Sequence, residues 1–332
     1  MKKLIFVLSG LLAVQLVMAV AMNLSSDDYD AFKPQEKLLA FDRKAVDGLR
    51  IEDGKNSVLL EKHDGEWRLP QSDGFPANTA NVERLLDTLA GLQKGWPVAT
   101  TAAAARRFKV ADDQFERKLS LLSNGKTLAV LYVGTSPGFR KVHVRADKQD
   151  DVFAVALNTW DANASTDDWI DKAVLTFSAD DITRVDMPGF VLQRDGDKLR
   201  VAELTDKEET NAKAAAALLD KLAGLRIQSL LGKDAKPEYQ QDKPELEFKV
   251  TRKQGDVLSY RISKPKEGAY YVLKRSDMAD YFKVAEYAVK PLKETARDKL
   301  VQNRPEPAPE QAAAGTSAPP HAAADESTGM AK

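Results

Sequence analysis

An internal repeat in this chain limits the folds that it can adopt. Residues 85–92 read LLDTLAGL and residues 218–225 read LLDKLAGL, a difference at one position. The surrounding segments agree in the same order: LEKHDG at 60–65 parallels LQRDG at 192–196, and VHVRADKQDDVFAV at 142–155 resembles YVLKRSDMADYFKV at 271–284. Matching segments in a fixed order indicate two copies of one structural unit.

Each copy is expected to begin with a β-hairpin. In the first copy Asp64-Gly65 closes the hairpin, because this dipeptide readily adopts positive φ, and the next strand contains Trp67-Arg68-Leu69. The corresponding strand of the second copy contains Leu199-Arg200-Val201.

A helix and further strands are expected to follow in each copy. Four apolar residues of the first copy recur at helical spacing: Val82, Leu85, Leu86 and Leu89. Asn78 is the predicted N-cap and Gly91 the C-terminal stop, and Asn211 and Gly224 take these roles in the second copy. Alternating apolar residues then predict a meander of strands across residues 119–144, repeated from residue 246 onward.

These patterns predict an α+β fold class. Strands that cluster on either side of one long helix favour two tandem homologous units with largely antiparallel sheets. The expected organisation is a membrane segment or signal at residues 1–22, a linker at 23–40, a first unit at 41–160, a junction at 161–180 and a second unit at 181–300. Residues 301–332 are rich in Ala and Pro and are expected to form a disordered tail, because they cannot bury enough apolar surface to offset ordering.

The N-terminus has the pattern of a membrane anchor. Lys2 and Lys3 precede an uncharged run at residues 4–22, which as a helix would be about 28 Å long, close to the ~30 Å hydrocarbon core of a bilayer. Ala19-Val20-Ala21 also fits a signal-peptidase site, so a cleaved signal is the alternative. Positive charge stays on the cytoplasmic side, which predicts a single-pass inner-membrane protein with most of the chain in the periplasm.

Composition excludes several classes of function. Lys plus Arg total 49 against 50 Asp plus Glu, and a net charge of -1 gives no overall field to hold a nucleic acid. The chain contains no Cys, which excludes disulfides, thiolate metal sites and Cys nucleophiles.

The order of segments resembles a bacterial family, domain of unknown function family 4340. The resemblance rests on the N-terminal hydrophobic segment, Trp67-Arg68-Leu69-Pro70, the LLDTLAGL helix, Tyr132-Val133-Gly134, and the junction DWIDK at 168–172 followed by Asp181-Ile182. It covers about residues 1–300 and has no catalytic signature. The resemblance implies a membrane-anchored extracytoplasmic protein that acts beside permease and substrate-binding-like subunits similar to those of gliding-motility ABC transporters.

Few residues offer catalytic or metal-binding chemistry. His63, His143 and His321 have no paired-His spacing, so no metal site is predicted. Residues 134–138 read GTSPG and fit the Gly-x-Ser-x-Gly elbow of α/β-hydrolases, but another strand follows and Pro137 lacks the N–H that the oxyanion hole needs. Ser136 is therefore expected to lie in a connecting loop, and no catalytic or cofactor-binding residue is predicted.

Charged and aromatic clusters have structural interpretations. Four acidic pairs are expected to be solvated: Asp112-Asp113, Asp150-Asp151, Asp167-Asp168 and Asp180-Asp181. Two basic clusters are expected to be solvated as well: Arg106-Arg107 with Lys109, and Arg140-Lys141 with Arg145. Trp67, Trp96, Trp160 and Trp169 are expected mainly to fill the core. A ligand or partner is expected at the seam between the copies, since concave sites favour domain junctions.

The leading functional hypothesis is a non-catalytic, membrane-tethered extracytoplasmic accessory or binding subunit of an ABC-transporter-like complex. The expected partners are the inner membrane, a permease and associated extracytoplasmic subunits, with no nucleic acid and no cofactor. The alternatives are an exported protein that binds a small ligand, or an exported hydrolase with Ser136 as its candidate nucleophile.

Overall fold

The computed structural model describes residues 12, 14, 15, 36–138 and 140–305. The predicted membrane segment lies almost entirely outside the described residues, as do residues 306–332 of the predicted tail (301–332). Residues 301–303, assigned to that tail from their sequence, form the short strand β20 (Val301–Asn303) instead. Within the described part of the chain, no helix combines the length and the apolar character required to cross a membrane.

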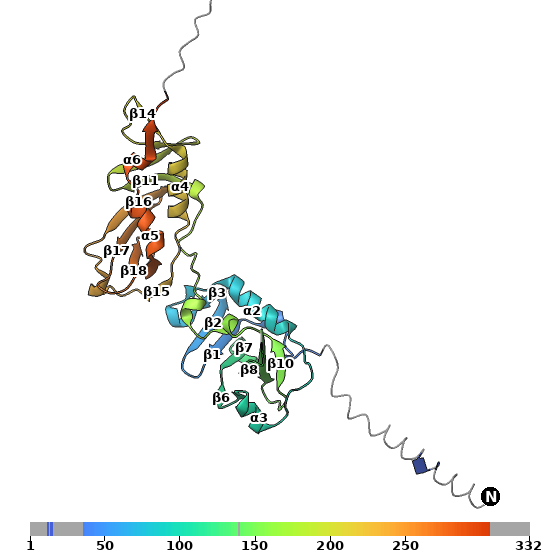
Figure 1. Ribbon diagram of the computed structural model, residues 1–332. Coiled ribbons are helices and arrows are strands. Elements are labelled where there is room, and N and C mark those ends of the chain that lie inside the picture. The colour runs from blue at the N-terminus through green and yellow to red at the C-terminus, as the bar shows by residue number, and fades with distance from the viewer. Residues whose placement is uncertain (1–11, 13, 16–35, 139, 306–332) are drawn as a thin grey trace, which may run out of the picture.

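Two eight-stranded sheets dominate the fold (Figure 1). The sheet of the first unit has, in spatial order, β10 (Phe153–Ala156), β9 (Lys141–Ala146), β8 (Lys126–Val133), β7 (Arg117–Ser123), β1 (Gly48–Glu52), β2 (Ser57–His63), β3 (Glu66–Leu69) and β4 (Phe75–Pro76). The sheet of the second unit has β13 (Lys198–Val201), β12 (Phe190–Asp195), β11 (Ile182–Met187), β16 (Leu246–Arg252), β17 (Val257–Ser263), β18 (Tyr270–Arg275), β19 (Tyr281–Ala285) and β15 (Ser229–Gly232). Neighbouring strands in both sheets are antiparallel, which confirms the predicted class.

Seven strands follow the same order in the two sheets. The first runs β3-β2-β1-β7-β8-β9-β10 and the second β13-β12-β11-β16-β17-β18-β19. Helix α2 (Thr79–Gly91) connects the hairpin to the meander in the first unit, and α4 (Ala212–Ala223) does so in the second. The sequence repeat therefore corresponds to a repeated chain path.

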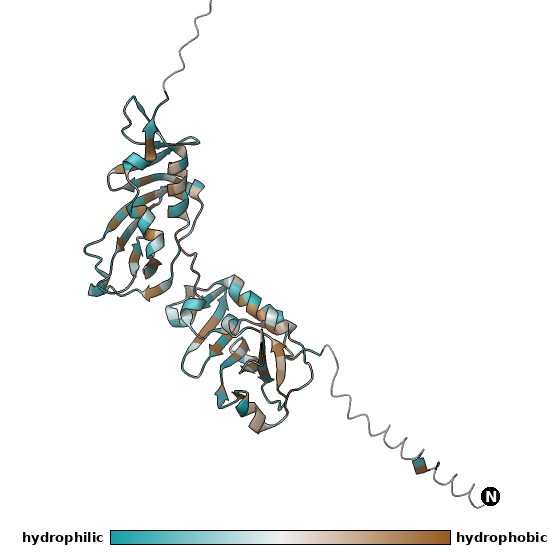
Figure 2. Cartoon of the chain, in the orientation of Figure 1, coloured by the Kyte–Doolittle hydropathy of each residue, from teal (hydrophilic) through white to brown (hydrophobic). Residues whose placement is uncertain are grey.

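The two helices begin in the same way. Asn78 Oδ1 accepts a hydrogen bond from Asn81 N–H at 3.1 Å, and Asn211 Oδ1 accepts one from Ala214 N–H at 3.1 Å, which confirms both N-caps. Gly224 is the C-cap of α4 as predicted, whereas Gly91 is the last residue of α2 and Leu92 is its C-cap. Figure 2 shows apolar and polar residues alternating along both helices, as expected for helices packed on a sheet.

The first hairpin turn also follows the sequence pattern. Asp64 has φ of 51° and Gly65 has φ of 88°, so both central residues adopt positive φ between β2 and β3. A two-residue turn of this type matches the right-handed twist of the flanking strands and fixes their register.

Strand β4 lies where the two units meet. The Phe75 and Phe282 rings are 6.2 Å apart between centroids, and Lys233 Nζ lies 3.0 Å from Asp73 Oδ2. Asp171 N–H donates to the Pro76 carbonyl at 2.9 Å, which ties the connecting segment to the same strand.

Candidate functional site

The two described histidines lie apart. His63 is exposed and its Nε2 is 3.4 Å from Glu61 Oε2, whereas His143 on β9 is buried and stacks on Phe108 with 4.1 Å between ring centroids. His321 is outside the described residues. Among the residues that the structure places, no group of three or more His, Cys, Asp or Glu could hold a metal ion.

Ser136 lies in the loop between β8 and β9. Its Oγ is 2.7 Å from the Gly138 carbonyl oxygen and 2.6 Å from the Lys141 carbonyl oxygen. The hydroxyl therefore closes a local turn. The chain continues into β9 rather than a helix, so the geometry of a nucleophile elbow is not formed here.

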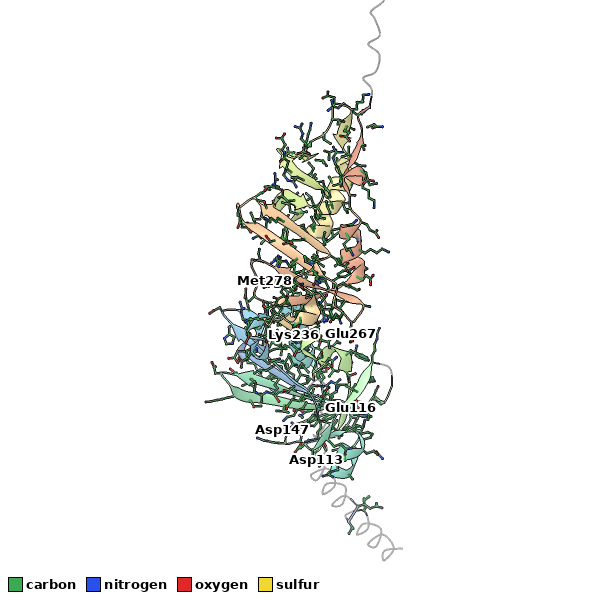
Figure 3. All side chains as sticks on the ribbon, turned by 90° about the vertical axis from the view of Figure 1, so that its left-hand side faces the viewer. Asp113, Glu116, Asp147, Lys236, Glu267 and Met278 are labelled. Carbon is green, nitrogen blue, oxygen red and sulfur yellow. The ribbon has the colours of Figure 1, made fainter. Side chains whose placement is uncertain are left out.

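Ion pairs involve two of the three residues of the basic cluster near helix α3 (Ala102–Arg107), and Arg107 lies over the Phe108 ring. Arg106 Nη2 is 2.9 Å from Asp113 Oδ2, and Lys109 Nζ is 3.1 Å from Glu116 Oε1. Figure 3 shows Asp113, Glu116 and Asp147 at the end of the first unit that is remote from the second. Exposed pairs of this kind indicate a solvated surface rather than a site.

The four tryptophans divide evenly between core and surface. Trp67 and Trp169 are buried, whereas Trp96 is 76% exposed and Trp160 is 80% exposed. The expectation that Trp fills the core is therefore right for two of them. Trp160 lies in the short helix η4 (Thr159–Ala162), where its side chain does not enter the sheet core.

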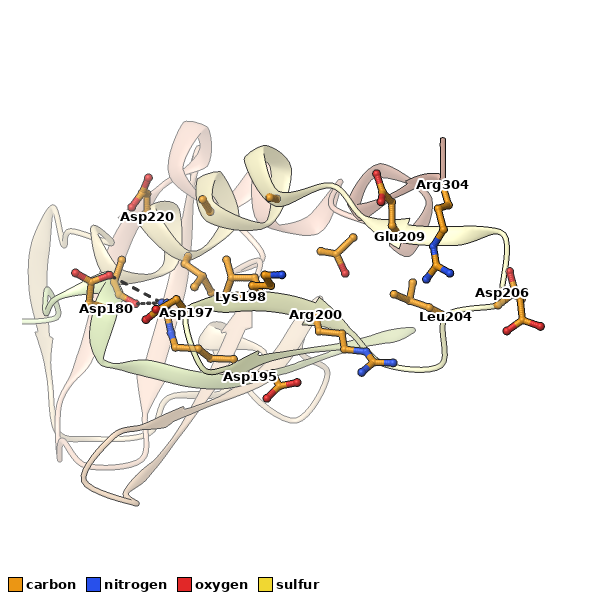
Figure 4. Close-up of a pocket in the computed structure, with 18 residues that line it drawn as sticks. Asp180, Asp195, Asp197, Lys198, Arg200, Leu204, Asp206, Glu209, Asp220 and Arg304 are labelled. Carbon is orange, nitrogen blue, oxygen red and sulfur yellow. Dashed lines mark hydrogen bonds and ion pairs between the residues drawn. The ribbon is translucent and has the colours of Figure 1, made fainter. Parts of the chain in front are cut away.

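A cleft of about 930 Å³ lies in the second unit (Figure 4). Strand β13, helix α4, the short helix η6 (Ala179–Asp181) and strand β14 (Glu208–Thr210) surround it, with Arg304 at one end. Leu199, Leu204 and Leu219 give it an apolar floor. The cleft lies within one unit rather than at the seam, because its walls come from the hairpin and helix of a single copy.

The same place in the first unit holds a polar plug, which we define as Arg43, Trp67 and Glu83, and a smaller hollow of about 650 Å³ remains beside it. Trp67 Nε1–H donates to Glu83 Oε1 at 2.6 Å, and Arg43 pairs through Nη2 with Glu83 Oε2. Arg43 Nε also lies 2.9 Å from Asp87 Oδ1. Burial of the Glu83 carboxyl opposes its ionisation, but the hydrogen bonds from Trp67 and Arg43 outweigh burial, so the pKa of Glu83 is lowered.

The second unit carries small or aliphatic residues at these three positions. Arg43 begins the short helix η2 (Arg43–Ala45) after its N-cap Asp42, and Ala179 begins η6 after its N-cap Ser178, so the two residues correspond. By the same matching of strands and helices, Leu199 replaces Trp67 and Ala216 replaces Glu83. The second unit therefore lacks the indole, the guanidinium and the carboxylate of the first unit, and the space that these groups would occupy is part of the cleft.

Strand β13 presents an uncovered edge to the cleft. In the first unit β4 pairs with β3, and Ala77 N–H donates to the Trp67 carbonyl at 2.8 Å. In the second unit β14 instead pairs with β20 (Val301–Asn303), and its Thr210 side chain accepts a hydrogen bond from Val201 N–H of β13 at 2.9 Å. The cleft therefore occupies the gap between two splayed strands.

Charges of both signs surround the cleft. Within the described ranges, the side chains of Lys198, Arg200 and Arg304 form no ion pair. The side chain of Asp220 forms none there either, although Asp87, at the corresponding position of the first unit, pairs with Arg43. Uncompensated charge around an apolar floor suits an amphipathic ligand or a polypeptide segment.

An ion pair holds the outer wall of the cleft. Arg297, on helix α6 (Arg297–Leu300), donates through Nη1 and Nη2 to the two carboxylate oxygens of Glu208, each at 2.9 Å. These hydrogen bonds, together with one from Thr205 N–H, lower the pKa of Glu208 to about 2. The pair fixes β14 against the C-terminal segment and away from β13.

A family model, described as domain of unknown function (DUF4340), matches residues 67–244, more than half of the chain. The chain belongs to the DUF4340 family. No curated protein and no solved structure matches this DUF4340 chain.

The cleft of this DUF4340 protein is not among the sites predicted from the sequence. The repeat itself contained the signal, since Trp67-Arg68-Leu69 aligns with Leu199-Arg200-Val201 and thus pairs an indole with a leucine. The loss of Glu83 and Arg43 at the matching positions becomes meaningful only once the three side chains are seen to meet.

Proposed function

We propose that this DUF4340 protein is a non-catalytic binding subunit that is tethered to the inner membrane and acts outside the cytoplasm as an accessory of an ABC-transporter-like complex. The second-unit cleft is its binding site, and the first unit is a structural copy of the same fold. One observation carries the binding role: two units with the same strand order differ at the plug, which leaves a hollow of about 650 Å³ in the first unit and is replaced by a cleft of about 930 Å³ in the second.

Sequence features support the location and the origin of the two units. Lys2 and Lys3 followed by the uncharged run at residues 4–22 fit a single membrane-spanning helix. The repeated octapeptide and the repeated chain path support descent of both units from one duplicated ancestor. The transporter role rests on the family resemblance.

Affinity purification after gentle detergent extraction tests the proposal. The tagged full-length protein is expected to recover permease-type membrane subunits, and Leu199→Trp is expected to reduce that recovery, because an indole would refill the cleft. Trp67→Leu, a change of the same two residue types in the first unit, is the matched control. Recovery of no membrane subunit in repeated experiments would contradict the accessory role.

An exported small-ligand-binding protein is the second candidate. A cleft of about 930 Å³ falls within the range of roughly 300–1,000 Å³ typical of small-molecule sites. Mass determination of the mature N-terminus separates the two proposals, because cleavage after Ala21 would release the chain from the membrane.

A further inference from the structure

The edge of β13 that borders the cleft has unpaired main-chain groups. Val201 N–H points away from β12, since it bonds to the Thr210 side chain, and Leu199 lies two residues earlier on the same edge. Among the residues that the structure describes, the N–H and C=O of Leu199 and the C=O of Val201 have no hydrogen-bond partner. Such an edge is a template for an added strand.

The first unit shows which main-chain donors bind an edge of this kind. There the segment that contains β4 lies along β3, where Gly74 N–H donates to the Leu69 carbonyl at 3.1 Å and Ala77 N–H donates to the Trp67 carbonyl at 2.8 Å. These two acceptors correspond to the two free carbonyls of β13. An extended polypeptide segment is therefore the class of occupant that the edge fits.

The first unit also shows which side chain accompanies these bonds. Phe75 of β4 lies opposite Leu69 and is buried on the core side of the sheet. The cleft of the second unit has a floor of leucine side chains in the same region: Leu199, Leu204 and Leu219. A segment that carries one large apolar residue suits that floor.

The charge around the cleft is acidic on balance. Six carboxylates line it: Asp180, Asp195, Asp197, Asp206, Glu209 and Asp220. Four basic groups line it: Arg194, Lys198, Arg200 and Arg304. Arg194 is paired with Asp180, at 4.0 Å between Nη2 and Oδ1. Carboxylates therefore exceed basic groups by two, which favours an occupant with basic side chains.

The acidic excess lies at the end of the cleft that the β12–β13 turn forms. Figure 4 shows Asp180, Asp197 and Asp220 at this end. Asp206 and Arg304 lie at the opposite end. Since β13 runs away from the turn, a strand antiparallel to it runs toward the turn. The C-terminal end of such a strand meets the carboxylates.

We propose that the cleft binds an extended segment of a partner protein, which adds to β13 as an antiparallel strand and carries an apolar side chain followed by basic residues. The inference deepens the proposed function and rests on it, since it takes the cleft as the binding site. The main chain of the segment bonds the free edge, its apolar side chain contacts the leucine floor, and its basic residues face the acidic end.

Peptide binding to the full-length protein in detergent tests the inference. The probe is the capped peptide acetyl-GFPAKK-amide, in which GFPA repeats residues 74–77 of the first unit. Its matched control has the same sequence with a methyl group on the alanine nitrogen, which removes the N–H that would donate to the Leu199 carbonyl and keeps every side chain and charge. The control is expected to bind roughly tenfold more weakly. Equal affinities, or no saturable binding of the probe, would overturn the inference.

Charge changes test the orientation of the added strand. Acetyl-GFPAEE-amide is expected to bind roughly tenfold more weakly than the probe at low salt. Asp220→Asn should weaken probe binding about threefold, whereas Asp206→Asn, at the other end of the same cleft, should weaken it less than about twofold. Equal losses at the two positions would contradict the antiparallel placement.

Amide hydrogen exchange at Leu199 shows what covers the edge. Exchange is expected to be fast in the protein alone and about tenfold slower in the presence of saturating probe. Slow exchange in the protein alone would overturn the inference, because a segment of this chain or of a second copy would then already cover the edge.

The inference and the proposed function can fail separately. If the probe binds as described while no membrane subunit co-purifies, the inference stands and the transporter role is lost. If Leu199→Trp lowers the recovery of membrane subunits while the probe does not bind, the cleft remains the binding site and the added strand is excluded.

Discussion

The indole Nε1–H of Trp67 donates a 2.6 Å hydrogen bond to Oε1 of Glu83, and this bond joins the hairpin of the first unit to helix α2. The corresponding residues of the second unit, Leu199 and Ala216, cannot form it. This contact and the Arg43–Glu83 pair are present in one copy and lost in the other, and the first unit has a hollow of about 650 Å³ where the second has a cleft of about 930 Å³.

Rebuilding the plug is expected to close the second-unit cleft. The triple variant Ala179→Arg, Leu199→Trp and Ala216→Glu restores the three side chains of the first unit. Its crystal structure should show the cleft reduced from about 930 Å³ toward the 650 Å³ of the corresponding hollow beside Arg43 and Glu83. An unchanged volume would mean that the splay of β13 and β14, rather than the lost plug, creates the cleft.

Glu83→Gln is expected to destabilise the protein by about 1–3 kcal/mol at neutral pH, because a charge-assisted bond to Arg43 is lost. The pKa of Glu83 is lower in the folded protein than its ordinary value of 4.5, so its contribution is present above that pH and disappears as the pH falls below it. Urea unfolding of both proteins at pH 7 and pH 3 checks this. Asp87→Asn, at an exposed position, should cost less than about 1 kcal/mol.

Because Glu208 is paired with Arg297, its carboxyl group is expected to have a low pKa. Carbon-detected NMR should give Glu208 a pKa of about 2 in the wild type, and Arg297→Gln should raise it toward the ordinary value of 4.5. Because the folded-state pKa is depressed, the stabilisation is present above pH 4.5 and is lost as the pH falls through about 2. A pKa near 4.5 in the wild type would show that the pair does not hold β14.

Arg145 and Arg275 are buried at corresponding positions, each opposite a tyrosine on the neighbouring strand: Tyr132 and Tyr260. Arg145 Nε donates to the Val110 carbonyl at 2.7 Å, and Arg275 Nη1 donates to the Leu175 carbonyl at 2.9 Å. Replacement of either by Lys removes the planar fork and should cost about 1–3 kcal/mol in denaturant unfolding.

The exposed Arg50 provides the control for these two substitutions. Arg50→Lys should change the free energy of unfolding by less than about 0.5 kcal/mol. If Arg→Lys changes the free energy of unfolding equally at the buried and the exposed positions, the hydrogen bonds of the two buried guanidiniums do not stabilise the fold.

The repeated elements were predictable because local patterns specify them. The Asp64-Gly65 turn, the Asn78 and Asn211 caps and the alternating strands each depend on neighbours in sequence, and each forms as expected. Signals of this kind can be recognised in the sequence because they agree with the final fold and do not depend on distant residues.

The cleft was not predictable, because it depends on residues that are distant in sequence. Ala179, Leu199 and Ala216 come from three different elements, and none differs from an ordinary core or surface residue on its own. The pairing of β14 with β20 instead of β13 likewise depends on the C-terminal segment, which lies almost a hundred residues further along the chain.

Strand β4 pairs with β3 at the edge of its own sheet, and its residue Phe75 also packs near Phe282 of the second unit. Releasing it would loosen the joint between the halves as well as expose the edge. In the second unit β14 pairs with β20 rather than with β13, and no residue of β14 takes part in the Phe75–Phe282 contact between the units. The edge of β13 can therefore be altered without disturbing that contact.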